Sequence, residues 1–444
     1  MNHRVLTLLT LLVIGLIALA ACAPAAQPTS APPTSAAAPT TAPATLAPSG
    51  SSGIPSPVAT VAPAATSAST GNTVHVSIVN KDMTKDDIAK AIQAEGTVVV
   101  ANWTYTANDT LVAQFQKYVK DTYGVDIKLT YEGSQAPSVY LTNLYTALKA
   151  NNPSPYDVMA IEEPYYFDGK ANDAVETIYP SGLMPNWDRV DPLFRHDPES
   201  VGFQSTATTA PIYHADKVNF LKDWKDLADP RLKGRITIPA SGDITAGGFL
   251  LGVAWSLGKD YKNPDDMKAA VDFVCNSIAP NALKVTSDSA TMQQLLRAGQ
   301  IDVAEFWNSL ARLEFLSGEA GTQDTTFTPM ASGQPMINGY LWIPKKAQHP
   351  ILAQIFIDWR LSDDVQFPAE SWGIGHGPWA ELQEGTLGPK YDTSKLIPDW
   401  FKADYSKFYP SFDQLKTTFK SVDWDYYAKN VNDWMTQYSK CAGG

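Results

Sequence analysis

The chain has 444 residues, of which 44% are hydrophobic and 11% aromatic, so it is long enough to bury more than one apolar core. Its formal net charge of −12 at pH 7 opposes binding to the phosphates of nucleic acids. It contains only three cysteines, which excludes a disulfide-rich scaffold and a cysteine-rich metal protein.

The N-terminus has the pattern of a secretion signal. A short basic start, Met1–Arg4, precedes an apolar run from Val5 to Ala21, and no charged stop-transfer segment follows. The last four residues of this region, Leu19–Cys22, resemble the bacterial lipobox, which implies cleavage before Cys22 and acylation of its sulfur. We therefore expect residues 1–21 to be a lipoprotein signal peptide and the mature protein to be anchored outside the cytoplasm by lipid. A plain signal peptide with an incidental cysteine is the alternative.

The segment 22–73 is predicted to be a disordered tether. After Cys22 it consists almost entirely of Ala, Pro, Thr, Ser and Gly, and it has no charged residue up to Asn72. A segment with so few large apolar side chains cannot offset the entropy lost on ordering, and its prolines favour extended backbone. Its Thr and Ser side chains are candidate glycan acceptors.

From Val74 onward, strand-like and helix-like segments alternate. β-Branched and apolar runs predict strands at His75–Val79, Thr97–Asn102, Val125–Leu129, Arg235–Ile238, Ile301–Ala304 and Tyr340–Ile343. Apolar residues at helical spacing predict helices that begin after Thr84, at Leu111, at about Gly248 and after Pro350. This alternation predicts an α/β fold with a mainly parallel sheet.

Several short segments resemble, in the same order, the periplasmic binding proteins of the polyamine and iron type. They are Val100–Tyr105, Tyr156–Met159, Asp223–Leu227, Asp229–Ile236, Ala304–Asn308, Leu341–Ala347, Ala353–Trp359 and Leu361–Gln366. The resemblance implies a two-lobed type II periplasmic-binding-protein fold with crossing hinge strands and a ligand cleft between the lobes. It also implies a substrate-binding lipoprotein of an ABC importer, with the permease and its ATPase subunits as partners. The region after Pro378 matches the family poorly.

This resemblance divides the globular part into two lobes. Residues 74–209 and 340–444 are expected to form lobe one, and residues 210–339 to form lobe two. The segments Ser205–Tyr213 and Asn338–Ile343 would cross between them. Such folds bind ligands at the carboxyl ends of their sheet strands, and hinge closure buries the solute. We expect a monomer that binds a small-molecule solute without a cofactor.

Aromatic and polar residues follow the predicted strands on the cleft side. An aromatic face suits an alkyl-amine chain or a cation. The resulting candidates for ligand contact are Trp103, Thr104, Tyr105, Trp307, Asn308 and Tyr340.

The polyamine-binding members clamp ammonium groups with carboxylates at two places, which by the resemblance fall at or near Gly339 and Gly248 of this chain. A glycine cannot bind an ammonium group, so the resemblance fails at these points. Glu162 and Glu163, at the end of a predicted strand, and Asp243, in the loop before the long helix, are the candidate replacements. A desolvated carboxylate binds an amine through charge-assisted hydrogen bonds, which favours a polyamine-like ligand. Solvated loop charges are the alternative.

The same loop supports a second interpretation. Ser241, Thr245 and the free N–H groups of a helix start could bind an anion such as phosphonate, sulfate or an iron–anion complex. Asp243 would oppose an anion there. Tyr165 and Tyr166 form a tyrosine pair, but no accompanying His and Asp set is evident, so no metal site is predicted.

Two further features leave alternatives open. Cys275 and Cys441 remain after lipidation and could pair in an oxidising compartment or stay separate thiols. No P-loop, zinc-protease or dinucleotide motif is present, so we expect no enzyme activity. Ser256 and His376 lack the surrounding residues of a catalytic motif. An extracellular enzyme or an envelope adhesion module remains the competing class of function.

Overall fold

The computed structural model describes residues 73–102, 109–204, 208–308, 310–311, 314, 321–322, 324–366 and 416–443. The predicted signal peptide, Cys22 and nearly all of the tether lie outside these residues, as do Trp103, Thr104, Tyr105 and His376. No helix in the described part of the chain has the length and apolar character needed to cross a membrane.

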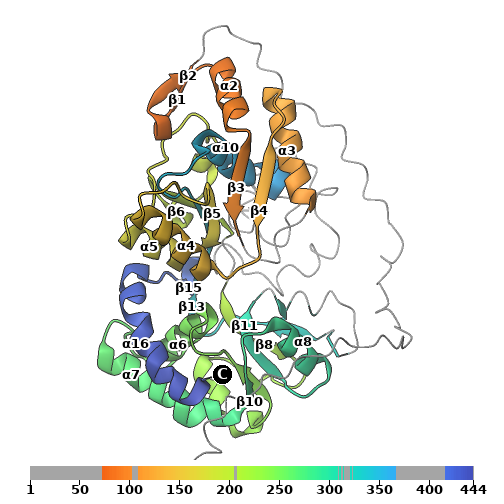
Figure 1. The fold of residues 1–444 in the computed structure, drawn as a ribbon. Coiled ribbons are helices and arrows are strands. Elements are labelled where there is room, and N and C mark those ends of the chain that lie inside the picture. The colour runs from red at the N-terminus through yellow and green to blue at the C-terminus, as the bar shows by residue number, and fades with distance from the viewer. Residues whose placement is uncertain are drawn as a thin grey trace, which may run out of the picture. The chain divides into compact units, whose positions relative to one another are not determined.

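The first sheet has six strands in the order β4-β3-β5-β14-β7-β6 (Figure 1). They are β3 (Thr97–Ala101), β4 (Lys128–Glu132), β5 (Val158–Glu162), β6 (Arg195–His196), β7 (Ser200–Gln204) and β14 (Gly339–Trp342). β3 is parallel to β4 and β5, whereas β14 is antiparallel to β5 and β7. Helices α2 (Lys85–Glu95), α3 (Asp109–Tyr123) and α10 (Pro350–Arg360) share one apolar core with this sheet. Helices α4 (Pro137–Lys149) and α5 (Glu163–Ala171) share another.

The second sheet repeats this arrangement with five strands in the order β10-β9-β11-β8-β12. They are β8 (Thr209–His214), β9 (Ile236–Ile238), β10 (Ala282–Val285), β11 (Val303–Trp307) and β12 (Thr325–Phe327). β9 is parallel to β10 and β11, and β8 is antiparallel to β11. Its helices are α6 (Ile244–Ser256), α7 (Pro264–Phe273), α8 (Ser289–Arg297) and α16 (Trp424–Ala442).

The remaining elements are short. Two small sheets pair β1 (Val74–Val76) with β2 (Lys81–Met83), and β13 (Gln334–Pro335) with β15 (Phe419–Lys420). Single turns of helix are η1 (Ser77–Val79), η2 (Trp187–Arg189), η3 (Pro192–Phe194), η4 (Trp224–Ala228), η5 (Pro230–Leu232), η6 (Val274–Ile278), η7 (Ala279–Asn281) and α11 (Asp363–Gln366).

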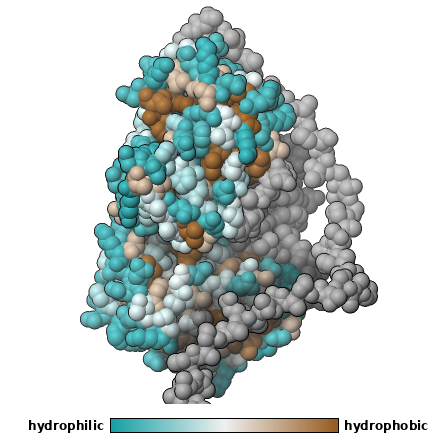
Figure 2. Space-filling view, viewed as in Figure 1, coloured by the Kyte–Doolittle hydropathy of each residue, from teal (hydrophilic) through white to brown (hydrophobic). Residues whose placement is uncertain are grey.

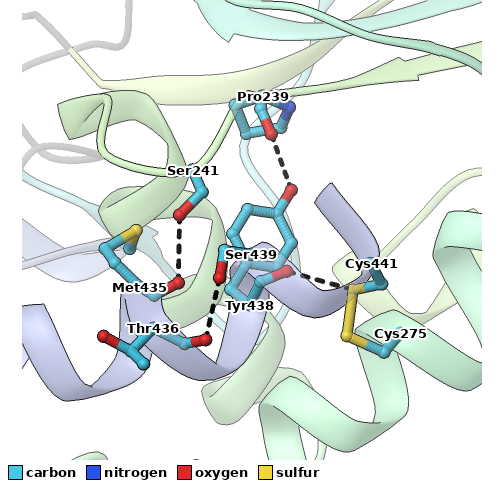
Figure 3. The surroundings of a disulfide bond; sticks show 8 residues. All are labelled: Pro239, Ser241, Cys275, Met435, Thr436, Tyr438, Ser439 and Cys441. Atoms are coloured by element: carbon cyan, nitrogen blue, oxygen red, sulfur yellow. Dashed lines mark hydrogen bonds between the residues drawn. A yellow bond between two sulfur atoms is a disulfide. The ribbon is translucent and has the colours of Figure 1, made fainter. Parts of the chain in front are cut away.

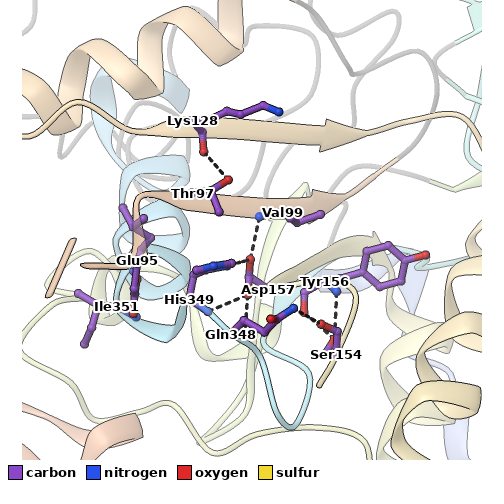
Figure 4. A network of polar contacts seen from close by, with 11 residues as sticks. Glu95, Thr97, Val99, Lys128, Ser154, Tyr156, Asp157, Gln348, His349 and Ile351 are labelled. Atoms are coloured by element: carbon purple, nitrogen blue, oxygen red, sulfur yellow. Dashed lines mark hydrogen bonds and ion pairs between the residues drawn. The ribbon is translucent and has the colours of Figure 1, made fainter. Parts of the chain in front are cut away.

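A network of polar contacts joins α10 to the amino-terminal ends of β3 and β5 (Figure 4). Asp157, just before β5, accepts the N–H of Val99 at 2.8 Å and contacts Nδ1 of His349 at 2.7 Å. Glu95, at the end of α2, accepts the N–H groups of Ile351 and Leu352 in the first turn of α10 at 3.0 and 2.8 Å. A carboxylate at this position complements the positive end of the helix. Burial nevertheless raises the pKa of Glu95 to about 7.

The visible face of the described residues is mainly hydrophilic, with scattered hydrophobic spots (Figure 2). Within the described ranges, the exposed large hydrophobic side chains are Val79, Val139 and Leu283, which come from three separate elements. Single apolar side chains of this kind are normal on a protein surface and do not mark a docking patch.

Most of the predicted elements are present, with shifted ends. The predicted strand His75–Val79 is wrong beyond Val76, because the chain turns through η1 and the left-handed Asn80 (φ 46°) into β2. The long apolar helix begins at Ile244, earlier than expected, because Asp243 caps its first turn.

The C-terminal helix contacts elements of both cores. We assigned residues 340–444 to lobe one, but Trp424, Tyr427, Trp434 and Tyr438 of α16 belong to the apolar core of α6, α7 and β9. The helix also packs extensively against α5 of the first sheet, so its assignment to one lobe stays a prediction. The exact boundaries between the lobes stay a prediction.

Candidate ligand site

Three carboxylates lie at or near the carboxyl ends of strands in the two sheets. Glu162 is the last residue of β5, Asp243 follows β9 and caps α6, and Glu305 lies in β11. Glu162 and Glu305 are both buried. Carboxyl ends of parallel strands are where α/β sheets bind ligands, so these three groups define the candidate site.

Glu305 is the most unusual of the three. Only 1% of its surface is exposed, and neither carboxylate oxygen has a hydrogen bond of normal geometry, although the Thr209 hydroxyl is close enough to act on it. Burial, and then the nearby Asp243 carboxylate, raise its pKa well above the usual range, while the Thr209 hydroxyl partly opposes the shift. No basic group is among these influences, and no described residue forms an ion pair with Glu305. A buried carboxylate without a countercharge is costly to fold.

Asp243 is held at the start of α6. Its Oδ1 accepts the N–H of Thr245 at 2.8 Å and the hydroxyl of Thr245 at 2.5 Å. This is the geometry of a helix N-cap, which brings the carboxylate to the positive end of a 13-residue helix. Both Thr245 donors that we predicted for an anion are thus directed at Asp243.

Two tyrosines connect Asp243 with Glu162. Burial raises the pKa of Tyr165, in α5, well above its usual value, and the Glu162 carboxylate raises this pKa further. Tyr427 of α16 and the Asp243 carboxylate act on Tyr165 in the same direction. Burial and then Asp243 also raise the pKa of Tyr427. The packing agrees with these influences, because α16 contacts both α5 and α6, and α5 contacts β5.

The two glycines that replace the expected carboxylates lie beside this group. Gly339 is the cross-strand partner of Glu162 in the antiparallel pair β14–β5. A Cβ atom on Gly248 would lie 2.4 Å from Oγ1 of Thr209, so α6 packs too closely on β8 for any side chain there. The carboxylates in this region are therefore Glu162, opposite Gly339, and Asp243, before Gly248.

Glu163 and Tyr340 belong to a different cluster from Glu162. Oε1 of Glu163 lies 2.6 Å from Nε2 of His196, and the imidazole ring stacks on Tyr340 and Tyr166 with ring centroids 4.8 and 5.1 Å apart. Tyr340 is fully buried. Glu163 therefore interacts with His196, in a cluster that His196, Tyr166 and Tyr340 form beside the first sheet.

The other predicted residues have internal partners as well. The Ser241 hydroxyl donates to the carbonyl of Met435 at 3.0 Å, and its N–H donates to the carbonyl of Ala442 at 3.1 Å. Asn308 accepts the N–H of Thr208 at 3.3 Å through Oδ1. Trp307 is partly buried at the end of β11, where it packs on the second core.

A disulfide joins Cys275, in η6, to Cys441, in α16 (Figure 3). It ties the C-terminal helix to the second core, where we had left pairing and separate thiols open. Near it, Tyr438 donates a hydrogen bond to the carbonyl of Pro239 at 2.7 Å. Among the described residues, no group of His, Cys, Asp and Glu side chains is arranged to hold a metal ion.

Three residues of this site were missed in the sequence: Glu305, Tyr165 as a partner of Glu162, and Tyr427. A sequence signal did exist for Glu305. Side chains alternate between the two faces of a strand, so Glu305 shares a face of β11 with Val303 and Trp307 and is a carboxylate in an otherwise apolar strand. No sequence signal links Tyr427 to this site.

Comparisons with known proteins agree on the family. Residues 106–367, more than half of the chain, match the bacterial extracellular solute-binding protein family. No curated protein matches the chain. Similar solved structures include an ABC transporter protein from Clostridium perfringens, with 18% identity and a TM-score of 0.59 over 78% of this chain and 100% of that chain.

Two further similar structures are of proteins associated with a particular solute. A spermidine/putrescine ABC transporter substrate-binding protein from Streptococcus pneumoniae has 17% identity and a TM-score of 0.57, over 78% of this chain and 99% of that chain. A protein from Trichodesmium in complex with iron and citrate has 16% identity and a TM-score of 0.57, over 79% and 100%. The predicted fold class is confirmed. The chain belongs to the family of bacterial extracellular solute-binding proteins and has the type II periplasmic-binding-protein fold.

Proposed function

We propose that this solute-binding protein of an ABC importer captures an organic amine, with a polyamine-like diamine as the favoured ligand. The carboxylates of Glu162, Asp243 and Glu305 would face its ammonium groups between the two sheets. The ligand would then be delivered to the permease and its ATPase subunits. A lipid on Cys22 would hold the receptor, a monomer, at the outer face of the cell membrane.

The observation that carries this proposal is the buried Glu305 beside Asp243. Two carboxylates repel each other, and removing Glu305 from water costs further free energy. No basic side chain of the described residues offsets this charge at Glu305. An ammonium group would compensate both costs, and charge-assisted hydrogen bonds between an amine and a carboxylate contribute about 1.5–3 kcal/mol each.

The positions of Glu162 and Asp243 support the same ligand. By the resemblance noted in the sequence, polyamine receptors carry carboxylates at or near the positions of Gly339 and Gly248. Glu162 is paired across the strands with Gly339, so its Cα lies about 5 Å away. Asp243 precedes Gly248 in the same loop and helix. Glu162 and Asp243 would thus lie close to the two expected carboxylate positions, one on each side of the ligand.

Anion binding is less well supported. The donors that an anion would need at this loop, on Ser241 and Thr245, are directed at α16 and at Asp243. A bound anion would also meet the Asp243 carboxylate. Anion binding nevertheless remains the outcome that would overturn the amine proposal.

Thermal-shift screening of the purified protein is the direct test. A ligand that binds only the folded state raises the melting temperature, by an amount that grows with its concentration relative to Kd. We expect stabilisation by putrescine or spermidine and none by methylphosphonate or sulfate. Stabilisation by the anions alone would overturn the amine proposal, and turnover of a bound compound would overturn the assignment as a transport receptor.

A further inference from the structure

The C-terminal helix α16 lies outside the segment that matches the family, yet it reaches the candidate site. It packs against α5 from the first sheet and against α6, α7 and η6 from the second (Figure 1). Most of its apolar side chains belong to the second core, and Phe167 of α5 packs on the same cluster. The helix therefore contacts both α5, which follows Glu162, and α6, which Asp243 caps.

Both ends of α16 are fastened. At its start, Asp423 forms an ion pair with Lys262 at 2.5 Å, and the Asp423 N–H donates to the Tyr261 hydroxyl at 2.9 Å. At its end, the disulfide between Cys275 and Cys441 joins it covalently to η6. The covalent tie is the stronger of the two, since an ion pair between exposed side chains contributes little.

The fastened end of α16 holds the loop that carries Asp243. The loop residue Ser241 donates two hydrogen bonds to backbone carbonyls of α16, and the N–H of Gly242 lies 3.4 Å from the sulfur of Met435. Figure 3 shows Pro239 and Ser241 of the loop facing Tyr438 and Met435 of the helix. Asp243 is the next residue of this loop, so its position depends on that of α16.

Tyr427 brings a hydroxyl from α16 to the first turn of α6. Its ring is buried against Trp424 and Trp434, with centroids 5.0 and 5.7 Å away. A Cβ atom on Gly247 would lie 1.8 Å from the Tyr427 hydroxyl oxygen, so this hydroxyl occupies the space where a larger residue would have its side chain. Only a glycine in this helical turn allows such a close approach.

We propose that α16 contributes directly to the ligand site. Tyr427 contributes its hydroxyl beside Asp243, and the disulfide-bonded end of the helix holds the Ser241–Asp243 loop in its binding position. This inference rests on the proposed function for the nature of the ligand. The effect of the disulfide on the loop does not depend on any ligand.

The first experiment compares Tyr427→Phe with Tyr426→Phe, using putrescine and isothermal titration calorimetry. Tyr426 is the matched control, since it lies on the same helix and donates its hydroxyl to the carbonyl of Lys262, away from Asp243. We expect Tyr427→Phe to raise Kd at least fivefold with its melting temperature retained, and Tyr426→Phe to bind as the wild type. Equal affinity in the two variants would overturn the role of Tyr427. If the wild type binds methylphosphonate and not putrescine, the same comparison is made with methylphosphonate, and the amine proposal fails separately.

The second experiment needs no ligand. Hydrogen–deuterium exchange of peptides covering residues 239–247 is compared between the wild type and the variant Cys441→Ser, and between oxidised and mildly reduced wild type. We expect faster exchange in this loop once the disulfide is lost, with exchange in β3 and β5 unchanged. Unchanged exchange in residues 239–247 of the reduced, still folded protein would show that α16 does not hold the loop, whatever the ligand is.

Discussion

Replacing Glu305 by Gln should separate ligand binding from folding. The substitution keeps the shape of the side chain and removes its charge, so the apo protein no longer has to bury a carboxylate next to Asp243. If Glu305 binds an ammonium group, the variant loses one charge-assisted hydrogen bond, worth about 1.5–3 kcal/mol. Since about 1.4 kcal/mol corresponds to a factor of ten, the Kd for putrescine should rise by roughly 10- to 150-fold.

Stability should change in the opposite direction. The pKa of Glu305 is raised in the folded protein, so the folded state retains a proton that the unfolded state releases. The stabilising effect of this proton is complete below the ordinary pKa of Glu and is lost as the pH rises. Glu305→Gln should therefore be at least as stable as the wild type at pH 8, with a flatter dependence of its unfolding free energy on pH.

The assay combines calorimetric titration with putrescine and urea unfolding at pH 5, 6.5 and 8. Glu95→Gln is the matched control, because Glu95 also has a raised pKa but lies at the opposite ends of the strands of the first sheet. It should alter the pH dependence of stability and leave the affinity unchanged. The reasoning is refuted if Glu305→Gln binds putrescine as tightly as the wild type, or if both variants lose affinity equally.

Three further predictions concern other parts of the molecule. The pKa of Glu95 rises from 4.5 to about 7, so this group's contribution to stability should fall by about 3 kcal/mol between pH 4.5 and 7, and urea unfolding of the Glu95→Gln variant should lack this decline. Gly247→Ala must displace the Tyr427 hydroxyl, so urea unfolding should show a loss of about 1–3 kcal/mol together with weaker putrescine binding; wild-type stability in this variant would contradict the packing. Replacing Cys275 and Cys441 by Ser should lower the unfolding free energy by about 2–5 kcal/mol, and an unchanged melting temperature under non-reducing conditions would show that the bond adds nothing.

Local patterns predicted much of the fold. A β-branched run bounded by Gly96 identified β3, and the capping residues after Thr84 identified the start of α2, because these signals come from neighbours in the chain. The capping role of Asp243 was missed, although the residue itself was recognised as a site candidate. Its N-cap geometry depends on a helix that starts four residues before the predicted Gly248.

The composition of the site was harder to predict. Glu162 and Glu163 are adjacent in sequence and were treated alike, yet a strand ends at the first and a helix begins at the second. Because of this change from strand to helix, Glu163 contacts His196, whereas Glu162 lies opposite Gly339. The contact between Tyr427 and Gly247 joins segments far apart in the chain, and no periodicity within either segment specifies it.

The buried carboxylates could instead be a structural feature that takes up a proton and binds nothing. Three features argue against this. Glu305 lacks hydrogen bonds of normal geometry, the nearby Asp243 is held in place by capping α6, and the charges of both Glu162 and Asp243 act on the buried Tyr165. A fold that needed only a neutral buried side chain could use Gln or Leu at Glu305 at a lower free-energy cost. Retaining an acid where a neutral residue would fold better is the usual sign of a site shaped for its ligand, and the ligand that compensates negative charge is a cation.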